Sequence, residues 1–509
     1  MKVGAIHSRL SPDFIGEPAH SEPLATSNYD ADTGQLNIDA PRDQNFQRSN
    51  DETFKGPGFS SPTVPIANRI FIEQQGDLVK VTIQSGNETR VIEQRGVHKL
   101  VIRTGDGNDL ITTGSPTDNY GDKSVNVDLE VHAGGGNDDV IGSWNGKNML
   151  YGDGGDDHLV GGGKDDQLEG GEGNDYLEGC DGNDRLFGGA GNDVSYGGRG
   201  DDFLFDDGGE QNYLEGGKGN DKLIAMNAGR NILSGGRGDD MIQSWGHDTV
   251  YTGLGKDDVL NVVGDDTVYG QDKEDHIASL FGHTNIVNVD IPDTLDIFGL
   301  KIPIAQGSSS IKMEGSTPFV DRMEDDIDMY RASPTGQQML RALDNAHANE
   351  PGAPTVTLKE APRSYLGTRE VTTSVEGHTL VRDGANVIKG KGADATVEIT
   401  PANPSYVRTS YSATVDDPLN QAGVWFPGSV WLYHELSHSY NQVTGTYQPG
   451  HTAHERQAVG LENGGLLYDF DGDPATPPTT ANPRVLTENG MRAEMGIPER
   501  PFYHDPSEQ

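Results

Sequence analysis

Apolar residues recur every nine positions through the middle of the chain. From Gly152 to Phe205 six units follow in tandem: GDGGDDHLV, GGGKDDQLE, GGEGNDYLE, GCDGNDRLF, GGAGNDVSY and GGRGDDFLF. The sixth position is always Asp, the eighth is almost always apolar, and glycines fill most of the first four. The apolar position indicates a very short buried strand in each unit, and the glycines indicate tight turns. The pattern therefore predicts a solenoid of stacked coils, with two units in each coil.

More divergent copies flank the six units. They stand at 104–112, 134–141, 216–224, 235–243 and 252–260. Lys164 and Lys256 occupy or adjoin positions where the repeat has Gly, and Asn212 replaces the Asp of the sixth position. We therefore expect fewer and weaker cation sites after residue 205.

Segments outside the repeats have other patterns. Residues 64–105 alternate apolar and polar positions with Gly and Asn breaks, which predicts strands that cap the solenoid at its start. Residues 285–305 predict a final strand pair that covers the other end, since a capped solenoid has no open edge. Residues 1–60 are polar and rich in Ser, Asp, Asn and Pro, which predicts a disordered export segment. Residues 307–319 have the composition of a linker.

Near the end of the chain the apolar spacing becomes helical. The segment WLYHELSHSYNQVTG (431–445) is predicted as one helix, with Ser429 as its N-cap and Gly445 as its stop. His434 and His438 are four residues apart, so they share one face of this helix. Two imidazoles at this spacing can hold one zinc ion. Glu435 can then act as general base on a zinc-bound water.

A zinc site of this kind needs a third ligand from elsewhere in the chain. The extended metzincin motif would place Gly at 441 and His at 444, but Asn441 and Thr444 stand there. Glu455 opens ERQAVGL, a segment of helical character, and is the preferred third ligand. An alternative is that Glu455 is a surface carboxylate paired with Arg456 or Arg492. The same stretch offers further candidate ligands: His451, His454 and Glu462.

The nine-residue consensus, G-G-x-G-x-D-x-U-x, resembles the RTX (haemolysin-type) calcium repeat. The resemblance implies a parallel β-roll in which calcium lies between the turns of successive coils, held by carboxylates and backbone carbonyls. We expect residues 130–280 to fold on calcium, because closely spaced carboxylates otherwise repel one another. The expected calcium ligands are Asp157, Asp166, Asp175, Asp184, Asp193, Asp202, Asp221 and Asp240.

Three blocks in order, HELSHSYNQVTG, ERQAVGL and TENGMRAEMGIPERPFY, resemble the NleD-like zinc metallopeptidases, and residues 321–346 resemble the start of that domain. These proteins are effectors that bacteria inject into eukaryotic cells by type III secretion. The resemblance covers about residues 320–509. It implies an α+β, zincin-like endopeptidase acting on host signalling proteins, with mitogen-activated protein kinases as the family's targets. A carboxylate third ligand resembles the gluzincin arrangement.

Charge and composition restrict the classes of partner that the protein can bind. A formal net charge of −42 makes nucleic acid or an anionic membrane surface an unfavourable partner. Cys180 is the single cysteine, so the chain forms no internal disulfide. The N-terminal residues lack the apolar core of a Sec signal peptide, and the sequence has no apolar run of bilayer-spanning length.

Together these features predict a multidomain protein: a disordered segment (1–60), a capped RTX β-roll (61–306), a linker (307–319) and a zinc metallopeptidase domain (320–509). We expect a secreted, monomeric effector that is delivered to the host cytoplasm and cleaves a host protein. Tyr447, Tyr468 or Tyr503 are candidates to stabilise the oxyanion. We also expect the peptidase domain to fold and act without the roll, which would serve delivery, localisation or partner binding.

Two alternatives remain open at this stage. The first is a secreted RTX calcium-binding or adhesion protein whose C-terminal domain is accessory or inactive. The second is a protease used against other bacteria or matrix proteins. Zinc content and a peptidase assay distinguish the first, and a kinase cleavage panel distinguishes the second.

Overall fold

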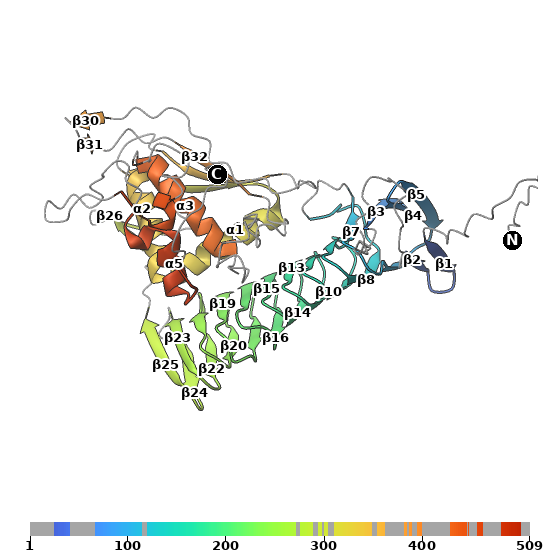
Figure 1. Ribbon diagram of the computed structural model, residues 1–509, viewed down its shortest axis with the longest axis horizontal. Helices are drawn as coiled ribbons and strands as arrows, with labels where there is room; N and C mark the ends of the chain where they lie inside the picture. Colours follow the sequence, from blue (N-terminus) through green and yellow to red (C-terminus); the bar gives the residue numbers. More distant parts are fainter. Residues whose placement is uncertain are drawn as a thin grey trace, which may run out of the picture.

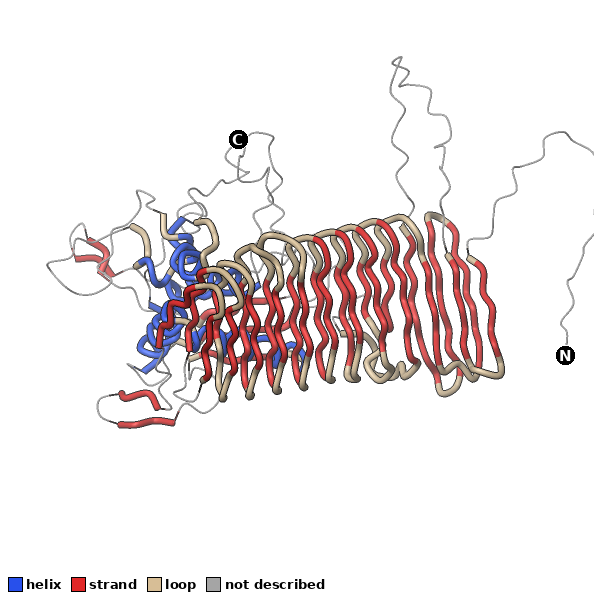
Figure 2. The backbone as a smooth tube through the Cα atoms, turned by 90° about the horizontal axis from the view of Figure 1, so that it is seen from below, coloured by secondary structure: helices blue, strands red, loops and turns tan. Residues whose placement is uncertain are grey.

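The computed structural model shows a long solenoid with a helical unit on one side of its C-terminal half (Figure 1). Seen from below, the strands of the solenoid lie in regular parallel rungs (Figure 2). The structure describes residues 25–40, 67–114, 120–270, 275–288, 294–297, 300–303, 310–348, 354–361, 381–383, 386–388, 394–399, 428–444, 446, 456–461 and 480–499.

The solenoid is the predicted parallel β-roll. Each strand pairs with the strand two further along, so that β10, β12 and β14 follow one another in one sheet while β11, β13 and β15 do so in the other. Leu168 is opposite Leu186 in this register, eighteen residues and thus two units apart. One coil therefore consists of two nine-residue units, as the repeat predicts.

The described residues of the roll form two long sheets. In order across the first sheet lie β1 (Thr26–Asp30), β2 (Gln35–Asp39), β6 (Lys99–Arg103), β8 (Asp128–Gly135), β10 (Asn148–Gly154), β12 (Gln167–Glu172), β14 (Arg185–Ala190), β16 (Phe203–Asp206), β18 (Lys222–Ala225), β20 (Met241–Ser244), β22 (Asp258–Asn261) and β24 (His276–Ser279). In order across the second lie β25 (His283–Asn288), β23 (Asp265–Gly270), β21 (Thr249–Tyr251), β19 (Ile232–Arg237), β17 (Tyr213–Lys218), β15 (Val194–Arg199), β13 (Tyr176–Asp181), β11 (His158–Gly162), β9 (Asp139–Ile141), β7 (Leu110–Thr113), β3 (Asn68–Gln75), β4 (Leu78–Ser85) and β5 (Glu88–Arg95).

The core of the roll is one side chain wide in each unit. Leu159, Leu168, Leu177 and Leu186 occupy the eighth position of successive units and are fully buried in one continuous cluster. Ser195 takes that position in the fifth unit and is also buried. So narrow a core removes little apolar surface from water for the length of chain that it orders.

The N-terminal cap is larger than predicted. β3, β4 and β5 form the expected antiparallel strands at 64–105, and β3 joins the roll by parallel pairing with β7. The prediction of disorder through residue 60 is wrong for residues 25–40. There β1 and β2 form an antiparallel hairpin, and β2 pairs in parallel with β6. Its two core residues, Leu36 and Ile38, are too few to stand out in a polar sequence.

At the other end, β25 ends the second sheet by parallel pairing with β23. The strand pair predicted within 285–305 is present as β26 (Thr294–Ile297) and β27 (Leu300–Pro303), which pair with each other in antiparallel fashion.

The C-terminal unit is the predicted α+β domain. β28 (Ile311–Glu314), β29 (Val356–Glu360) and β32 (Ala395–Ile399) form a parallel sheet, and β30 (Val381–Asp383) pairs with β31 (Asn386–Ile388). The described helices include α1 (Thr317–Ala332), α2 (Pro334–Ala348), α3 (Gly428–Thr444) and α5 (Glu488–Glu494), with a 3₁₀ turn, η2, at Arg484–Leu486.

The segment predicted as a linker belongs to this domain. Residues 307–319 contain β28 and the first turn of α1. Ser316 caps α1 by accepting a hydrogen bond from the backbone N–H of Phe319 at 3.4 Å, and Pro318 fits the first turn. The strand IKME is short and stands between Gly- and Ser-rich stretches, so its sequence resembles a linker although Ile311 is buried.

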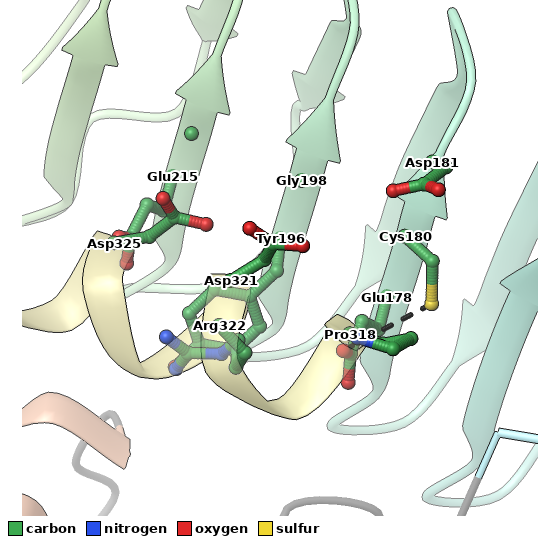
Figure 3. Close-up of a pocket in the computed structure, with 11 residues that line it drawn as sticks. Glu178, Cys180, Asp181, Tyr196, Gly198, Glu215, Pro318, Asp321, Arg322 and Asp325 are labelled. Carbon is green, nitrogen blue, oxygen red and sulfur yellow. Dashed lines mark hydrogen bonds between the residues drawn. The ribbon is translucent and has the colours of Figure 1, made fainter. Parts of the chain in front are cut away.

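Helix α1 contacts β15, β17 and β19 of the roll. Figure 3 shows its residues Pro318 to Asp325 alongside the strands that carry Glu178, Tyr196 and Glu215. Three basic residues at the third position of alternate units, Arg199, Lys218 and Arg237, face this helix. Arg199 and Lys218 pair with Asp321 at 2.5 and 2.7 Å, Lys218 reaches Glu324 at 2.7 Å, and Arg237 pairs with Asp328. The three acidic positions lie on one helix face.

The spacing of the helix matches the spacing of the coils. Seven residues of helix rise about 10.5 Å, and two steps between neighbouring strands span about 9.6 Å. An α-helix laid along the roll can thus place one carboxylate opposite each successive basic residue.

Arg322 fills the centre of this interface. Its side chain is 4 % exposed, lies 3.4 Å from the centre of the Tyr196 ring and pairs with Asp326 at 2.9 Å. A cavity of about 20 Å³ remains beside it, enough space for about one water molecule (Figure 3). Tyrosines of the roll share one hydrophobic cluster with Phe319 and Met323 of α1. The roll and the α+β domain therefore share a core.

We predict that Arg322→Met destabilises the calcium-loaded protein by about 3–5 kcal/mol, because Asp326 would stay buried without its cation. Urea unfolding of the full chain measures the change. Arg341→Met, at an exposed position of α2, is the control and should change stability by less than about 0.5 kcal/mol. Equal effects of the two substitutions would show that the Arg322 interface contributes nothing.

Candidate metal centres

Helix α3 presents the histidine motif. The predicted helix at 431–445 is present, although Ser429 is its second residue rather than its N-cap, and Gly445 lies outside the described residues. The apolar residues of the motif region are fully buried: Val430, Leu432, Tyr433 and Leu436. The helix is therefore packed on its apolar faces, and the face that bears His434, Glu435 and His438 is buried as well.

The geometry of these three residues fits a metal site. The Nε2 atoms of His434 and His438 lie 3.0 Å apart, with their rings at 88°. Two imidazole nitrogens on one tetrahedral zinc, each at 2.0–2.1 Å, lie roughly 3.3–3.4 Å apart. A ligand atom of Glu435 is within 4.8 Å of both. The three residues are 8, 7 and 3 % exposed in sequence order, so the site is largely shielded from water.

A buried carboxylate lies beside the first histidine. Glu488, the first residue of α5, is 1 % exposed, and its Oε2 lies 2.9 Å from Nδ1 of His434. Its other oxygen accepts a hydrogen bond from Nε of Arg492 at 2.6 Å. A carboxylate on Nδ1 leaves Nε2 of His434 directed at the metal position, which is a common arrangement around metal-binding histidines. Sequence analysis missed this role of Glu488, although the block TENGMRAEMGIPERPFY contains it.

The motif helix is fixed from two further directions. Tyr433 donates from its hydroxyl to the carbonyl of Val485 at 2.6 Å and lies 3.0 Å from that of Thr335. Ser437 donates to the carbonyl of Leu486 at 2.7 Å. These contacts join α3 to α2 and to the η2–α5 segment, so that His434 and Glu488 meet in a defined geometry.

The predicted third ligand, Glu455, lies outside the described residues, as do His451, His454 and Glu462 and the oxyanion candidates Tyr447, Tyr468 and Tyr503. The residues after Glu455 are described and helical from 456 to 459, in agreement with the predicted helical character of ERQAVGL. They end at Gly460, where an added Cβ would meet the Thr487 side chain at 2.8 Å. Thr487 caps α5 immediately before Glu488. The segment that follows Glu455 therefore lies beside the histidine site.

The eight predicted calcium ligands form two columns along the roll, and all are buried. Within a column, the backbone N–H of each predicted ligand donates to a side-chain Oδ1 one coil further on, which belongs to an Asp in every case except that of Asp193, where it belongs to Asn212. Asp157 donates to Asp175 at 2.8 Å, and Asp166 donates to Asp184 at 2.7 Å. One oxygen of each carboxylate thus stabilises the turn.

The second oxygen has a different environment. In seven of the eight predicted ligands Oδ2 is buried and accepts no hydrogen bond from the described residues: Asp157, Asp175, Asp184, Asp193, Asp202, Asp221 and Asp240. Asp175 Oδ2 and the carbonyl oxygen of Gly188 lie 2.3 and 2.6 Å from the point where Gly170 would carry a Cβ. Only glycine leaves this space, and hard oxygens line it. Such a cradle suits calcium, which prefers carboxylate and carbonyl oxygens.

Burial changes the acidity of these groups. It raises the pKa of Asp175 to about 8 and that of Asp184 and Asp221 to about 9, with neighbouring carboxylates adding to the shift. A carboxylate removed from water resists ionisation unless a cation compensates its charge. The columns therefore need either protons or metal ions.

Sequence analysis omitted several members of the columns. Asp109, Asp138 and Asp257 occupy the same sixth position in the divergent copies, and their Oδ2 atoms are buried in the same way. Their phase in the repeat could have identified them. Asn212 continues the column by accepting from the backbone of Asp193 at 2.8 Å, but its amide adds no charge. Fewer cation sites after residue 205 therefore remain a prediction.

Comparison with known families agrees with this geometry. Residues 307–503 match the model of the Peptidase M91 family, which is described as an effector protein. Four copies of the RTX calcium-binding nonapeptide repeat match residues 151–182, 170–204, 206–242 and 227–259. The comparisons with curated proteins and with solved structures gave no match.

The C-terminal part of this chain thus matches an effector peptidase family. RTX calcium-binding repeats precede it, and both predicted resemblances are confirmed. Among the described residues, no helix has the length and apolar character needed to cross a bilayer.

We predict that the calcium-free roll becomes less stable as pH rises. The folded-state pKa values of about 7–9 exceed the unfolded value of about 3.9. The folded roll therefore holds more protons, so its stability is greatest below about pH 4 and is lost as pH rises through 7–9. Urea midpoints in chelator at pH 5 and pH 8 measure this, and about 10 mM calcium should restore stability at pH 8.

Asp184→Asn keeps the Oδ1 acceptor but removes the charge, so it should stabilise the chelated protein at pH 8 and weaken calcium binding. The control is Glu172→Gln, an exposed carboxylate at the end of β12. A chelated roll that gains stability from pH 5 to pH 8 would contradict this account of the columns.

We predict that Glu488→Gln weakens zinc binding about 10–100-fold while the fold persists, because the amide no longer offers a negative charge to His434 Nδ1. Competition with a chromophoric zinc chelator measures the affinity. Glu499→Gln, which breaks an exposed pair with Arg484, is the control and should leave zinc affinity unchanged. If Glu488→Gln binds zinc as tightly as the wild type does, Glu488 does not orient His434.

Proposed function

We propose that this chain is a secreted effector zinc endopeptidase that cleaves a host protein. The observation that carries the proposal is the buried cluster of His434, Glu435 and His438, with two ring nitrogens 3.0 Å apart, inside the region that matches an effector peptidase family. A pair of surface histidines on an exposed helix would show neither the burial nor the carboxylate behind His434.

Each residue of the proposed site has a separate role in peptide hydrolysis. His434 and His438 hold the metal through Nε2, and we assign Glu455 as the third ligand because a helical turn follows it beside the site. A bound zinc ion supplies a water of lowered pKa and polarises the scissile carbonyl. Glu435 takes a proton from the attacking water and delivers it to the leaving amide nitrogen.

The substrate assignment depends on the family. Effectors of the NleD-like group act on host signalling proteins, so we propose mitogen-activated protein kinases as the substrate class and the host cytoplasm as the site of action. Tyr447, Tyr468 or Tyr503 would donate a hydrogen bond to the developing oxyanion. We further propose that the protein acts as a monomer.

One observation favours a second function. The Asp columns form a built set of cation cradles without any contribution from the histidine site, as a calcium-binding or adhesion protein would require. In that case the peptidase domain would be accessory or inactive. The shielded position of Glu435 between the two histidines favours the peptidase.

We predict that Glu435→Ala lowers proteolysis by roughly 10²–10⁴-fold while zinc remains bound, because Glu435 acts on the water rather than on the metal. Metal analysis gives the zinc content, and mass spectrometry of a kinase panel and a eukaryotic lysate gives the cut peptides. Glu499→Ala is the matched control.

Wild-type cleavage rates in Glu435→Ala would end the peptidase proposal. If the wild-type protein binds zinc and cuts lysate proteins but no kinase, the peptidase proposal stands and kinases are rejected as its substrate class. Calcium binding without zinc would favour the second function.

A further inference from the structure

One short helix contacts both the histidine site and the roll. The first residue of α5, Glu488, lies against His434. At the other end, Glu494 Oε1 accepts a hydrogen bond from the hydroxyl of Tyr251 at 3.1 Å, and the carbonyl of Met495 accepts from Thr249 at 3.3 Å. Tyr251 and Thr249 belong to β21 of the roll. Seven helical residues span only about 10 Å, so the roll holds α5 close to the metal ligand.

Glu494 also ties the roll to the motif helix. Its second oxygen accepts a hydrogen bond from the backbone N–H of Thr335 at 2.8 Å. The carbonyl of Thr335 lies 3.0 Å from the hydroxyl of Tyr433, the residue before His434. A single side chain therefore links β21 with α2 and, through one more residue, with α3.

The same strand adjoins a calcium cradle. Tyr251 is followed by Thr252, and Thr252 O and Asp240 Oδ2 lie 2.3 and 2.5 Å from the point where Gly235 would carry a Cβ. Asp240 is buried, and its Oδ2 accepts no hydrogen bond from the described residues. A cation held there would fix the backbone immediately after Tyr251.

We propose that the roll is part of the catalytic unit, with Tyr251 and Glu494 as positioning residues. Calcium at the Asp240 cradle fixes β21, β21 holds α5 through Glu494, and α5 holds Glu488 against His434. Calcium thereby raises the zinc affinity of the histidine site. The inference depends on the proposed zinc peptidase. It replaces the expectation from sequence that the peptidase domain acts without the roll.

The coupling must be reciprocal if it exists. A factor by which calcium tightens zinc binding equals the factor by which zinc tightens calcium binding. Coupling between binding sites is typically about 5–150-fold. Calcium affinity measured with and without zinc therefore gives a second, independent measurement of the same factor.

The test measures zinc affinity of the full chain by competition with a chromophoric chelator, in calcium-free buffer and in about 10 mM calcium. Four proteins are compared: wild type, Tyr251→Phe, Glu494→Gln and Tyr176→Phe. Tyr176→Phe is the matched control, because it also removes a buried hydroxyl bonded to a glutamate at 3.1 Å, but that bond stays within the roll. Circular dichroism checks that each roll forms in calcium.

We expect calcium to tighten zinc binding at least about 5-fold in wild type and Tyr176→Phe, and by clearly less in Tyr251→Phe and Glu494→Gln. The cobalt-substituted proteins should show the same difference in their visible spectra. Calcium titrations of the wild type with and without zinc should show that zinc tightens calcium binding by the same factor by which calcium tightens zinc binding.

Zinc affinity that is independent of calcium in wild type would overturn the inference and leave the peptidase proposal intact. So would a calcium effect in Tyr251→Phe as large as in Tyr176→Phe. A wild-type protein that binds no zinc under either condition would instead overturn the proposed function, and this inference with it.

Discussion

The structure depends on how buried carboxylate charge is neutralised. The roll has a core one side chain wide, and beside it stand two columns of Asp side chains with one oxygen in the backbone ladder and the other in a cradle of carbonyl oxygens. When the Asp side chains are ionised and no cation is bound, their charge opposes the fold that burial of the leucine side chains favours. With a divalent cation the same oxygens bind coils together. The Asp residues thus make the roll conditional on its ions.

The α+β domain packs against the roll. Arg199, Lys218 and Arg237 repeat with the coils, and α1 offers a carboxylate to each because its pitch is close to the strand spacing. Beyond this interface, α5 lies between β21 and His434. The position of His434 is therefore determined partly by residues of β21, more than 180 positions earlier in the chain.

Sequence reasoning predicted what is local or periodic. The nine-residue phase predicted the roll, its coil length and the phase of the Asp columns, and the His-x-x-x-His spacing predicted the helix and the shared face. It missed β1–β2 and β28, because each has few apolar residues within polar sequence. It also missed the roles of Glu488, Glu494 and Tyr251. Each of these acts through a partner that is close in space but distant in sequence, which no spacing along the chain reveals.

Anomalous diffraction from crystals grown with zinc and calcium tests the central claim most directly. The account predicts a zinc peak at about 2.0–2.1 Å from Nε2 of both His434 and His438, with Glu488 on the far side of the His434 ring. It also predicts calcium peaks beside Oδ2 of the column Asp residues, with one at Asp240. Zinc found only among the Asp columns, or an ordered histidine pair without a metal peak, would contradict it.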